Sequence, residues 1–360
     1  MTKITEAASP SSNSMSFTGR PRTRGGRSVA AFVSLSLLVL GGTTASAQTS
    51  EPRPDADEPR ISNPGSVVTA QPPTAPRAGV TFDTSDVHTF DGDVKGSSGS
   101  SVSSTSLYAR LAPRVPIGEH LTLSFPLDAA LSFYAFSGNP LSLPLGGEVW
   151  DQVRAFSIGA QAHYSFDRHW ALLVGANGAS AGTQGASFNQ TLTEGGTLGF
   201  SYTFSRALTL GFGVTAQSQL AGGPYVLPFP VIDWRLPFDG GRWQLEAGAV
   251  RAGPGRAAGV SLAYTPSEAL SFNLGLAAPG LGREFRLASS NGVTGGVGRD
   301  SAFPLTFGVR LRPMKPLTVS LYGGLSLFHK VTVLDSRGNT LDERDVKPAP
   351  ELGGQISLAL

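Results

Sequence analysis

The sequence predicts an all-β fold: a single antiparallel transmembrane β-barrel of about 14 strands or, as the alternative, about 12. Three observations support this prediction. Long segments alternate between apolar and small or polar residues, short charged turns alternate with long Gly- and Ser-rich loops, and aromatic residues stand next to the short turns. We expect a signal peptide over 1–47, a disordered Pro-rich periplasmic leader over 48–78, and the barrel over 79–360.

The composition narrows the class of protein. The 360 residues include 45 Gly, no Cys and only 15% charged residues, and the formal net charge is +2. The absence of Cys excludes disulfides, thiol catalysis and thiolate metal sites. The small net charge does not favour nucleic-acid binding, and no apolar run in the sequence is long enough to cross a bilayer as a helix.

The N-terminal segment has the features of a secretory signal. Arginines over 20–27 precede an apolar stretch over 29–40, and Ala45–Ala47 has the small-x-small shape of a cleavage site. An apolar stretch of about 12 residues is too short for a membrane anchor. Residues 48–78 are polar, aperiodic and rich in Pro, so we expect them to be disordered.

One sequence pattern occurs twice. Residues 164–176 read "YSFDRHWALLVGA" and residues 202–214 read "YTFSRALTLGFGV". In the second copy Leu210 and Phe212 alternate with glycines, so one face of the strand is apolar and the other is small or polar. The connection over 205–207 is short enough to force an antiparallel hairpin.

Alternating strands fit a soluble β-sandwich as well as a membrane barrel. The barrel is favoured because segments of about 10 to 15 residues are long for soluble strands, and because the polar faces carry Gly, Ser, Thr and Gln in place of Lys and Glu. Aromatic residues next to the turns are typical of a membrane interface. Those expected there are Tyr164, Phe166, Trp170, Tyr202, Phe204, Trp234, Phe238, Trp243 and Tyr264.

The segment from 79 to 90 is the weakest strand and could instead be a leader or plug element, in which case about 12 strands remain. An even number of strands places both chain ends on the periplasmic side. Long loops are expected over 138–151, 180–194, 278–301 and 329–348. The expected strands are 79–90, 103–116, 120–137, 152–166, 169–180, 195–204, 207–220, 229–238, 242–251, 257–265, 269–277, 302–312, 316–328 and 350–360.

A resemblance supports this interpretation. Residues 229–253, "FPVIDWRLPFDGGRWQLEAGAVRAG", and the following "YTPSEALSFNLGL" resemble an uncharacterised outer-membrane β-barrel family, a domain of unknown function. The resemblance covers about 80–360 and implies a porin-like barrel in a Gram-negative outer membrane. It implies outer-membrane lipid and the barrel assembly machinery as partners, and no catalytic residues. One departure is Leu360, because barrels of this class commonly end in an aromatic residue that the machinery reads.

The sequence offers little for catalysis, and we expect no enzyme activity, no cofactor and no metal. His163 is expected on the lumen face with Gln161 and Ser165, which suggests a membrane-embedded hydrolase as the weakest hypothesis, since no G-x-S-x-G motif appears. The histidines do not have metal-ligand spacing. They are His88, His120, His163, His169 and His329.

Charged residues on the polar faces are candidates for lining a pore. Opposite charges could pair across strands and fill the interior, or they could form a constriction that selects solutes by size and charge. Arg110 with Arg114, and Arg310 with Arg312, are the best candidates for a field that attracts anions, or for a basic vestibule. The full set is Arg110, Arg114, Asp128, Asp233, Arg235, Glu246, Arg310 and Arg312.

Three functions remain open. The first is a passive pore or transport channel for small solutes, because about 14 strands enclose a wide lumen. The second is a structural or adhesive barrel that acts through its long loops, which a lumen filled by Tyr108, Tyr134, Tyr322 and Phe328 would favour. The third is the hydrolase. Association of barrels into homo-oligomers stays open, and nucleic acid is not an expected partner.

Overall fold

The structure is a computed structural model that describes residues 78–138, 141, 150–250, 257–277, 283–288, 293 and 295–360. All of these belong to the compact unit Glu58–Leu360. The expected signal peptide, 1–47, and the expected leader, 48–78, lie outside the described residues apart from Ala78. No helix in the described part of the chain is long and apolar enough to cross a membrane.

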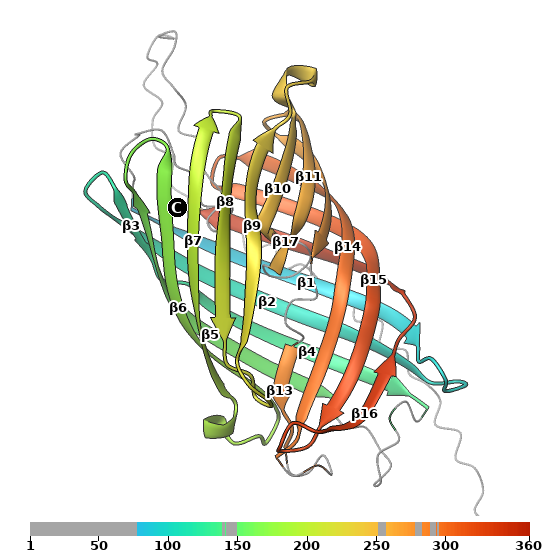
Figure 1. The fold of residues 1–360 in the computed structure, drawn as a ribbon. Coiled ribbons are helices and arrows are strands. Elements are labelled where there is room, and N and C mark those ends of the chain that lie inside the picture. Colours follow the sequence, from blue (N-terminus) through green and yellow to red (C-terminus); the bar gives the residue numbers. More distant parts are fainter. Residues whose placement is uncertain are drawn as a thin grey trace, which may run out of the picture. The chain divides into compact units, whose positions relative to one another are not determined.

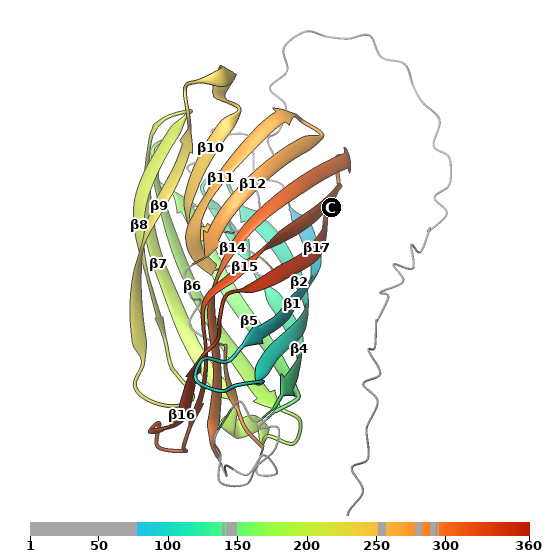
Figure 2. The same cartoon turned by 90° about the vertical axis from the view of Figure 1, so that its right-hand side faces the viewer.

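The described residues form a closed antiparallel β-barrel (Figures 1 and 2). β1 pairs with both β2 and β17, which closes the ring. The 17 strands are β1 (Gly79–Asp93), β2 (Ser101–Ile117), β3 (Leu121–Ser124), β4 (Leu127–Ser137), β5 (Gln152–Ser165), β6 (Trp170–Thr183), β7 (Leu192–Ser205), β8 (Leu208–Gln217), β9 (Tyr225–Arg235), β10 (Trp243–Val250), β11 (Ala257–Ser267), β12 (Leu270–Ala277), β13 (Arg283–Arg286), β14 (Val297–Met314), β15 (Leu317–Leu334), β16 (Thr340–Asp345) and β17 (Ala349–Ala359).

The wall of the barrel consists of 14 strands. β3 and β4 are two halves of one wall strand, which reduces the 17 strands to 16. β13 and β16 are short strands outside the wall, which leaves 14. This confirms the expected fold class and strand number, and the alternative of about 12 strands is wrong. The segment at 79–90 is a full wall strand, β1, because its backbone is paired on both sides.

The barrel has two different ends. At one end, which we call the turn end, short turns such as 166–169 and 206–207 join the strands, and Val80 donates from its N–H to the Leu360 carbonyl at 2.9 Å. At the other end, the loop end, the longer connections meet β13 and β16. In Figure 1 the turn end is at the top and the loop end is at the bottom.

The two faces of the wall carry different residues, as the alternation predicts. On β7 and β8 the outward-facing Leu198 and Phe212 are 56% and 55% exposed, while the inward-facing Ser201 and Thr209 are 1% and 4% exposed. Large apolar side chains exposed in this way on a continuous wall are suited to contact with lipid. An exposed apolar face and a buried polar face on the same strand are typical of a transmembrane barrel.

Several of the expected interface aromatics contact one another across strands near the turn end. The ring centroids of Trp170 on β6 and Tyr202 on β7 are 4.4 Å apart, and those of Trp243 on β10 and Tyr264 on β11 are 4.8 Å apart. Their outward position agrees with an aromatic girdle, although their depth in a membrane remains a prediction.

Strand ends differ from the expected ones mainly at the loop end. β14 begins at Val297 and β15 runs to Leu334, and β13 and β16 occupy parts of the expected loops 278–301 and 329–348. The reason is burial: Val331 and Val333 are 3% and 0% exposed and Thr332 between them is 3% exposed, so this part of β15 is covered on both faces and continues beyond the expected end of the strand. The Gly- and Ser-rich composition of these segments therefore does not mark where the strands end.

β9 also differs from its expected range of 229–238. It covers Tyr225–Arg235, and within the described residues it pairs with β10 only over Ile232–Arg235. Pro228 and Pro230 stand in the remaining part of β9, where they pair with β8. Since Pro has no N–H, it is tolerated on a strand edge that has no second partner.

Gly324 is required by a close approach of backbones. A Cβ at this position would lie 2.1 Å from the Leu305 carbonyl oxygen on β14, the strand paired with β15. At the neighbouring Gly323, the nearest atom to such a Cβ would be the Glu351 carbonyl oxygen at 3.5 Å, an ordinary contact.

We expect Gly324→Ala to lower the free energy of unfolding of the refolded barrel by about 1 to 3 kcal/mol, because the added methyl group forces β14 and β15 apart. Urea titration followed by tryptophan fluorescence measures this change. Gly323→Ala is the matched control and should change the free energy by less than about 0.5 kcal/mol. Equal effects of the two variants would contradict the packing described for Gly324.

Candidate functional site

Polar side chains line much of the inner surface of the wall, and Asp128 has three of them as partners. Arg110 Nη1 on β2 lies 3.1 Å from Asp128 Oδ1 on β4, and the side chains are 13% and 19% exposed. The Tyr108 hydroxyl also donates to Asp128, and Ser157 Oγ donates to Asp128 Oδ2 at 3.1 Å. Two of the expected pore-lining residues therefore neutralise each other.

The other expected pore-lining residues are spread around the lumen. Asp233 and Glu246 are register partners on β9 and β10; Gln244 Nε2 donates to Asp233 at 2.7 Å, and Ser261 Oγ donates to Glu246 at 3.4 Å. Arg310 pairs in register with Ser271 and Ser320. Arg312 is exposed close to the turn end, Arg235 is partly buried, and Arg114 lies on β2. The structure thus brings together only parts of the predicted set.

Three of the four aromatic residues considered as lumen fillers face inward. Tyr108 and Tyr134 donate to Asp128 and Asp300, and the Tyr322 hydroxyl donates to the Asp86 carbonyl oxygen at 2.6 Å. Phe328 is 77% exposed and has a φ of 49°, at the irregularity where the pairing of β14 with β15 shifts. Phe328 therefore does not fill the lumen, because this irregularity turns its side chain outward.

A short segment crosses the loop end of the barrel. β13 pairs with β14 on one side, and Arg286 forms a parallel bridge to Gly182 at the end of β6 on the other. β6 and β14 are separated by six wall strands in either direction around the ring, so they are opposite each other. We call residues 283–288 the crossbar. The crossbar links two strands on opposite sides of the barrel, whereas the pairings of the wall link neighbouring strands.

Arg286 anchors the crossbar through three backbone carbonyls. Its Nε donates to Gln190 O at 3.0 Å, its Nη1 to Gly295 O at 2.6 Å and its Nη2 to Leu220 O at 3.0 Å. These acceptors belong to the β6–β7, β13–β14 and β8–β9 connections. Burial lowers the pKa of the Arg286 guanidinium, and the nearby Glu284 carboxylate opposes that shift. One side chain therefore ties three loops together.

The β6 end of the crossbar is held by Thr183 and its far face by Glu284. Thr183 Oγ1 donates to the Arg286 carbonyl at 3.5 Å and accepts from the Ala288 N–H at 2.8 Å. Glu284 pairs with Arg299 on β14 and accepts from the Leu220 N–H at 3.0 Å. These contacts fix the segment at both walls.

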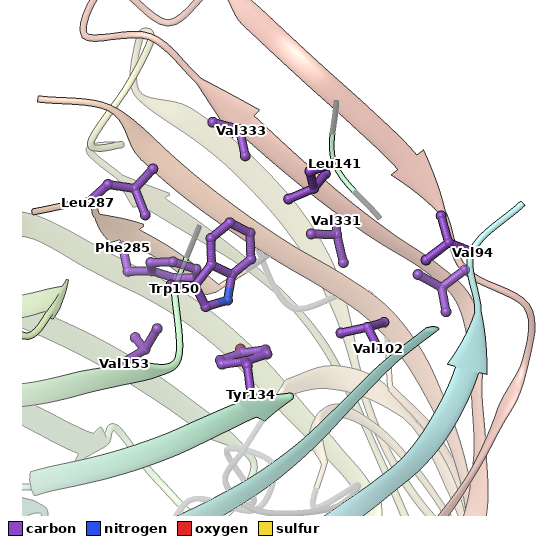
Figure 3. Packing of buried hydrophobic residues seen from close by; sticks show 11 residues of the cluster. Val94, Val102, Tyr134, Leu141, Trp150, Val153, Phe285, Leu287, Val331 and Val333 are labelled. Atoms are coloured by element: carbon purple, nitrogen blue, oxygen red, sulfur yellow. The ribbon is translucent and has the colours of Figure 1, made fainter. Parts of the chain in front are cut away.

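An apolar cluster fills one side of the crossbar (Figure 3). Trp150 is at its centre: its ring lies 5.0 Å from that of Phe285, 5.2 Å from that of Phe136 and 6.0 Å from that of Tyr134. Together with the crossbar we call this cluster the plug. Its buried residues are Val94, Val102, Tyr134, Leu141, Trp150, Val153, Phe285, Leu287, Val331, Val333 and Val346.

A polar contact underlies the plug. Asp300 on β14 accepts from the Tyr134 hydroxyl on β4 at 2.8 Å, and its other oxygen lies 2.7 Å from His329 Nε2 on β15. β4 is not a neighbour of β14 or β15 in the ring, so this contact also spans the lumen. Among the described residues, two buried polar atoms of this region have no hydrogen-bond partner, namely Trp150 Nε1 and His329 Nδ1.

The plug was not predicted, because most of its residues fall in segments expected to be loops. Trp150 and Leu141 lie in or beside 138–151, Phe285 and Leu287 in 278–301, and Val331, Val333 and Val346 in 329–348. The available signal was the apolar content of these segments, above all the alternation of Val331 with Val333 and a single Trp in a Gly-rich stretch.

The described residues give no geometric support to an enzyme site. They contain no group of three or more His, Asp or Glu residues arranged to hold a metal ion. Within this part of the chain His163 has no hydrogen-bonded hydroxyl group that could act as a nucleophile. His163 is close enough to Arg114 for the two side chains to interact electrostatically.

Comparison with known proteins gives one matching family and several similar solved structures. Residues 147–339 match the family described as "Domain of unknown function (DUF6268)". No curated protein matches. Similar solved structures include an outer membrane channel of Pseudomonas putida F1, at 11% identity and TM-score 0.45, covering 83% of this chain and 100% of that chain. Another is the Pseudomonas putida toluene transporter TodX, at 12% identity and TM-score 0.34, covering 79% and 90%.

We expect Arg286→Gln to loosen the loop end while the wall stays folded, because three hydrogen bonds to different loops are lost. Amide exchange in 184–191 and 218–224 should become faster by at least about tenfold, as expected for losing about 1.4 kcal/mol. Exchange measured by mass spectrometry checks this. Arg154→Gln, at an exposed position on β5, should leave exchange in both loops unchanged; similar acceleration in both variants would contradict the anchoring role.

Proposed function

This chain belongs to the DUF6268 family of unknown function, and we propose that it is an outer-membrane pore for small solutes, closed at its loop end by the plug. In this proposal the turn end, with both ends of the barrel segment, faces the periplasm, and the loop end faces the outside. This is the orientation usual for barrels with short turns on one side and long loops on the other.

The observation that carries the proposal is the distribution of large side chains inside the barrel. On β6, β7 and β8 the largest inward-facing residues are Leu173 and Gln217, and the others are Gly, Ala, Ser, Thr or Asn. Such side chains are too small to fill the lumen of a 14-strand barrel. On the neighbouring β9 the Phe229 ring lies over Gly213, and the largest cluster of buried apolar residues is the plug.

The plug favours the hypothesis of a gated channel over that of a barrel with a solid core. A barrel that served only as a scaffold could be filled along its whole length, as small barrels are. Here the apolar contacts are concentrated in one layer, and that layer is held by a segment outside the wall. Displacing the crossbar would open the loop end without breaking any pairing between wall strands.

The structural or adhesive barrel remains the second candidate, and one observation favours it. Tyr108, Tyr134 and Tyr322 all form hydrogen bonds inside the barrel, and Arg110 is neutralised by Asp128. Hydrogen-bonded side chains from β2, β4 and β15 therefore occupy part of the lumen. The two candidates differ in whether loosening the plug produces a conducting path.

We expect Phe285→Ala to increase the open fraction of single channels in planar bilayers. Removing a buried Phe costs about 3 to 5 kcal/mol, and even about 3 kcal/mol shifts a closed–open equilibrium by about a hundredfold. The matched control is Phe307→Ala, since Phe307 is 54% exposed on the outer surface. It should conduct as the unaltered chain does.

The result that would overturn the pore is a correctly folded Phe285→Ala barrel that carries no current. Folding is verified separately by the shift in gel mobility between heated and unheated samples. A silent, folded variant would favour the structural or adhesive barrel.

A further inference from the structure

We propose that Arg114 and His163 form a binding site inside the barrel for the oxyanion group, carboxylate or phosphate, of a small solute. The inference rests on the proposed function in that the lumen must be the route by which such a solute reaches the site. It goes beyond that function because it names one place and one ligand chemistry.

Arg114 lies in an environment without carboxylates. Its register partners are Gly79 on β1 and Ser124 on β3. The next inward positions are Ala112 and Thr81, which are 3% and 7% exposed, and neither carries a charge. Within the part of the chain that the structure describes, no carboxylate pairs with the Arg114 guanidinium.

Arg110 shows what a neutralised lumen arginine looks like in the same strand. Its register partners are Asp83 on β1 and Asp128 on β4, so a carboxylate lies on each side, and Asp128 forms the 3.1 Å ion pair. The charge of Arg110 also acts on Arg114, and it is repulsive. The two arginines on one face therefore differ: one is compensated by the protein and the other is not.

His163 adds a second basic group to the same region. It lies on β5, opposite Thr122 of β3, and the Arg114 charge acts on it. No described residue forms a hydrogen bond or ion pair with its ring. The Arg114 guanidinium and the His163 ring lie on either side of β3, and no described carboxylate pairs with either, so both can donate to one external anion.

Neutral donors complete the site. Ser124 on β3 pairs in register with both Arg114 and Gln161. The Ser124 hydroxyl donates to Gln161 Oε1 at 3.4 Å, so the Gln161 amide NH₂ group is directed to other acceptors. Hydrogen-bond donors next to a guanidinium suit an oxyanion with several acceptor oxygens better than they suit chloride.

The chemistry of the guanidinium selects the ligand class. Arginine binds carboxylate and phosphate through two parallel hydrogen bonds, and these are stronger than bonds between neutral groups. Removing a charged group from water without a partner is costly. Folding has already taken the Arg114 guanidinium partly out of water, so an oxyanion that binds it does not have to supply this desolvation free energy. Lysine would keep the charge at this position but lose the two-pronged geometry.

The test measures binding and does not depend on conductance. The full chain is refolded in a deuterated non-ionic detergent, and the ³¹P line width of millimolar inorganic phosphate is followed. We expect broadening with the unaltered chain and at least about a fivefold loss of that broadening in Arg114→Gln. Arg154→Gln, which removes an exposed arginine from β5, should retain it.

Further variants keep the test decisive if Arg114→Gln does not fold. Arg114→Lys should bind with intermediate strength, and His163→Gln should bind more weakly than the unaltered chain. Acetate added to the phosphate sample should narrow the line if the site accepts carboxylates, and leave it unchanged if it accepts phosphate alone. Equal broadening in folded Arg114→Lys, His163→Gln and unaltered chains would overturn the site.

The outcomes separate this inference from the proposed function. Phosphate binding that depends on Arg114 in a barrel that never conducts would support the site and contradict the pore. Conductance without Arg114-dependent binding would support the pore and contradict the site.

Discussion

Closure of the ring is the constraint on which the rest of this structure depends. Lipid offers no hydrogen bonds to a free strand edge, so each wall strand needs a partner on both sides. The chain meets this requirement by pairing β1 with β17 over Thr81–Ala359 to Thr89–Glu351, and with β2. The Tyr322 hydroxyl reaches the Asp86 carbonyl across Gly353, where a Cβ would lie 2.3 Å from that oxygen. Glycine thus permits a further link at the seam.

A closed ring of 14 strands creates a lumen that small inward-facing residues cannot fill. A segment that is not part of the wall crosses one end of this lumen. Arg286 ties the crossbar to three loops, and Trp150 and Phe285 form the apolar layer beside it. Because the wall is complete without the plug, the plug can differ in stability from the wall, and closure can be separated from folding.

Most of the wall could be predicted from the sequence, because the period-two alternation that places Leu198 outward and Ser201 inward is a local signal. The ends of β14 and β15 and the existence of β13 could not be predicted in this way, since they depend on contacts between distant segments. The Arg110–Asp128 pair was within reach of the sequence, as both residues were expected in the lumen. That Arg114 lacks such a partner depends on register, which a single sequence does not specify.

The claim that a crossbar joins opposite walls can be tested most directly with a pair of cysteines, because the chain has none of its own. Thr183 Oγ1 accepts from the Ala288 N–H at 2.8 Å, so these two positions are adjacent. In the folded Thr183→Cys/Ala288→Cys variant we expect mild oxidation to form an intramolecular disulfide, detected as protection of both thiols from a maleimide under denaturing conditions. Each single-cysteine variant should stay reactive. Two reactive thiols in the oxidised, folded double variant would contradict the crossbar and, with it, closure of the loop end.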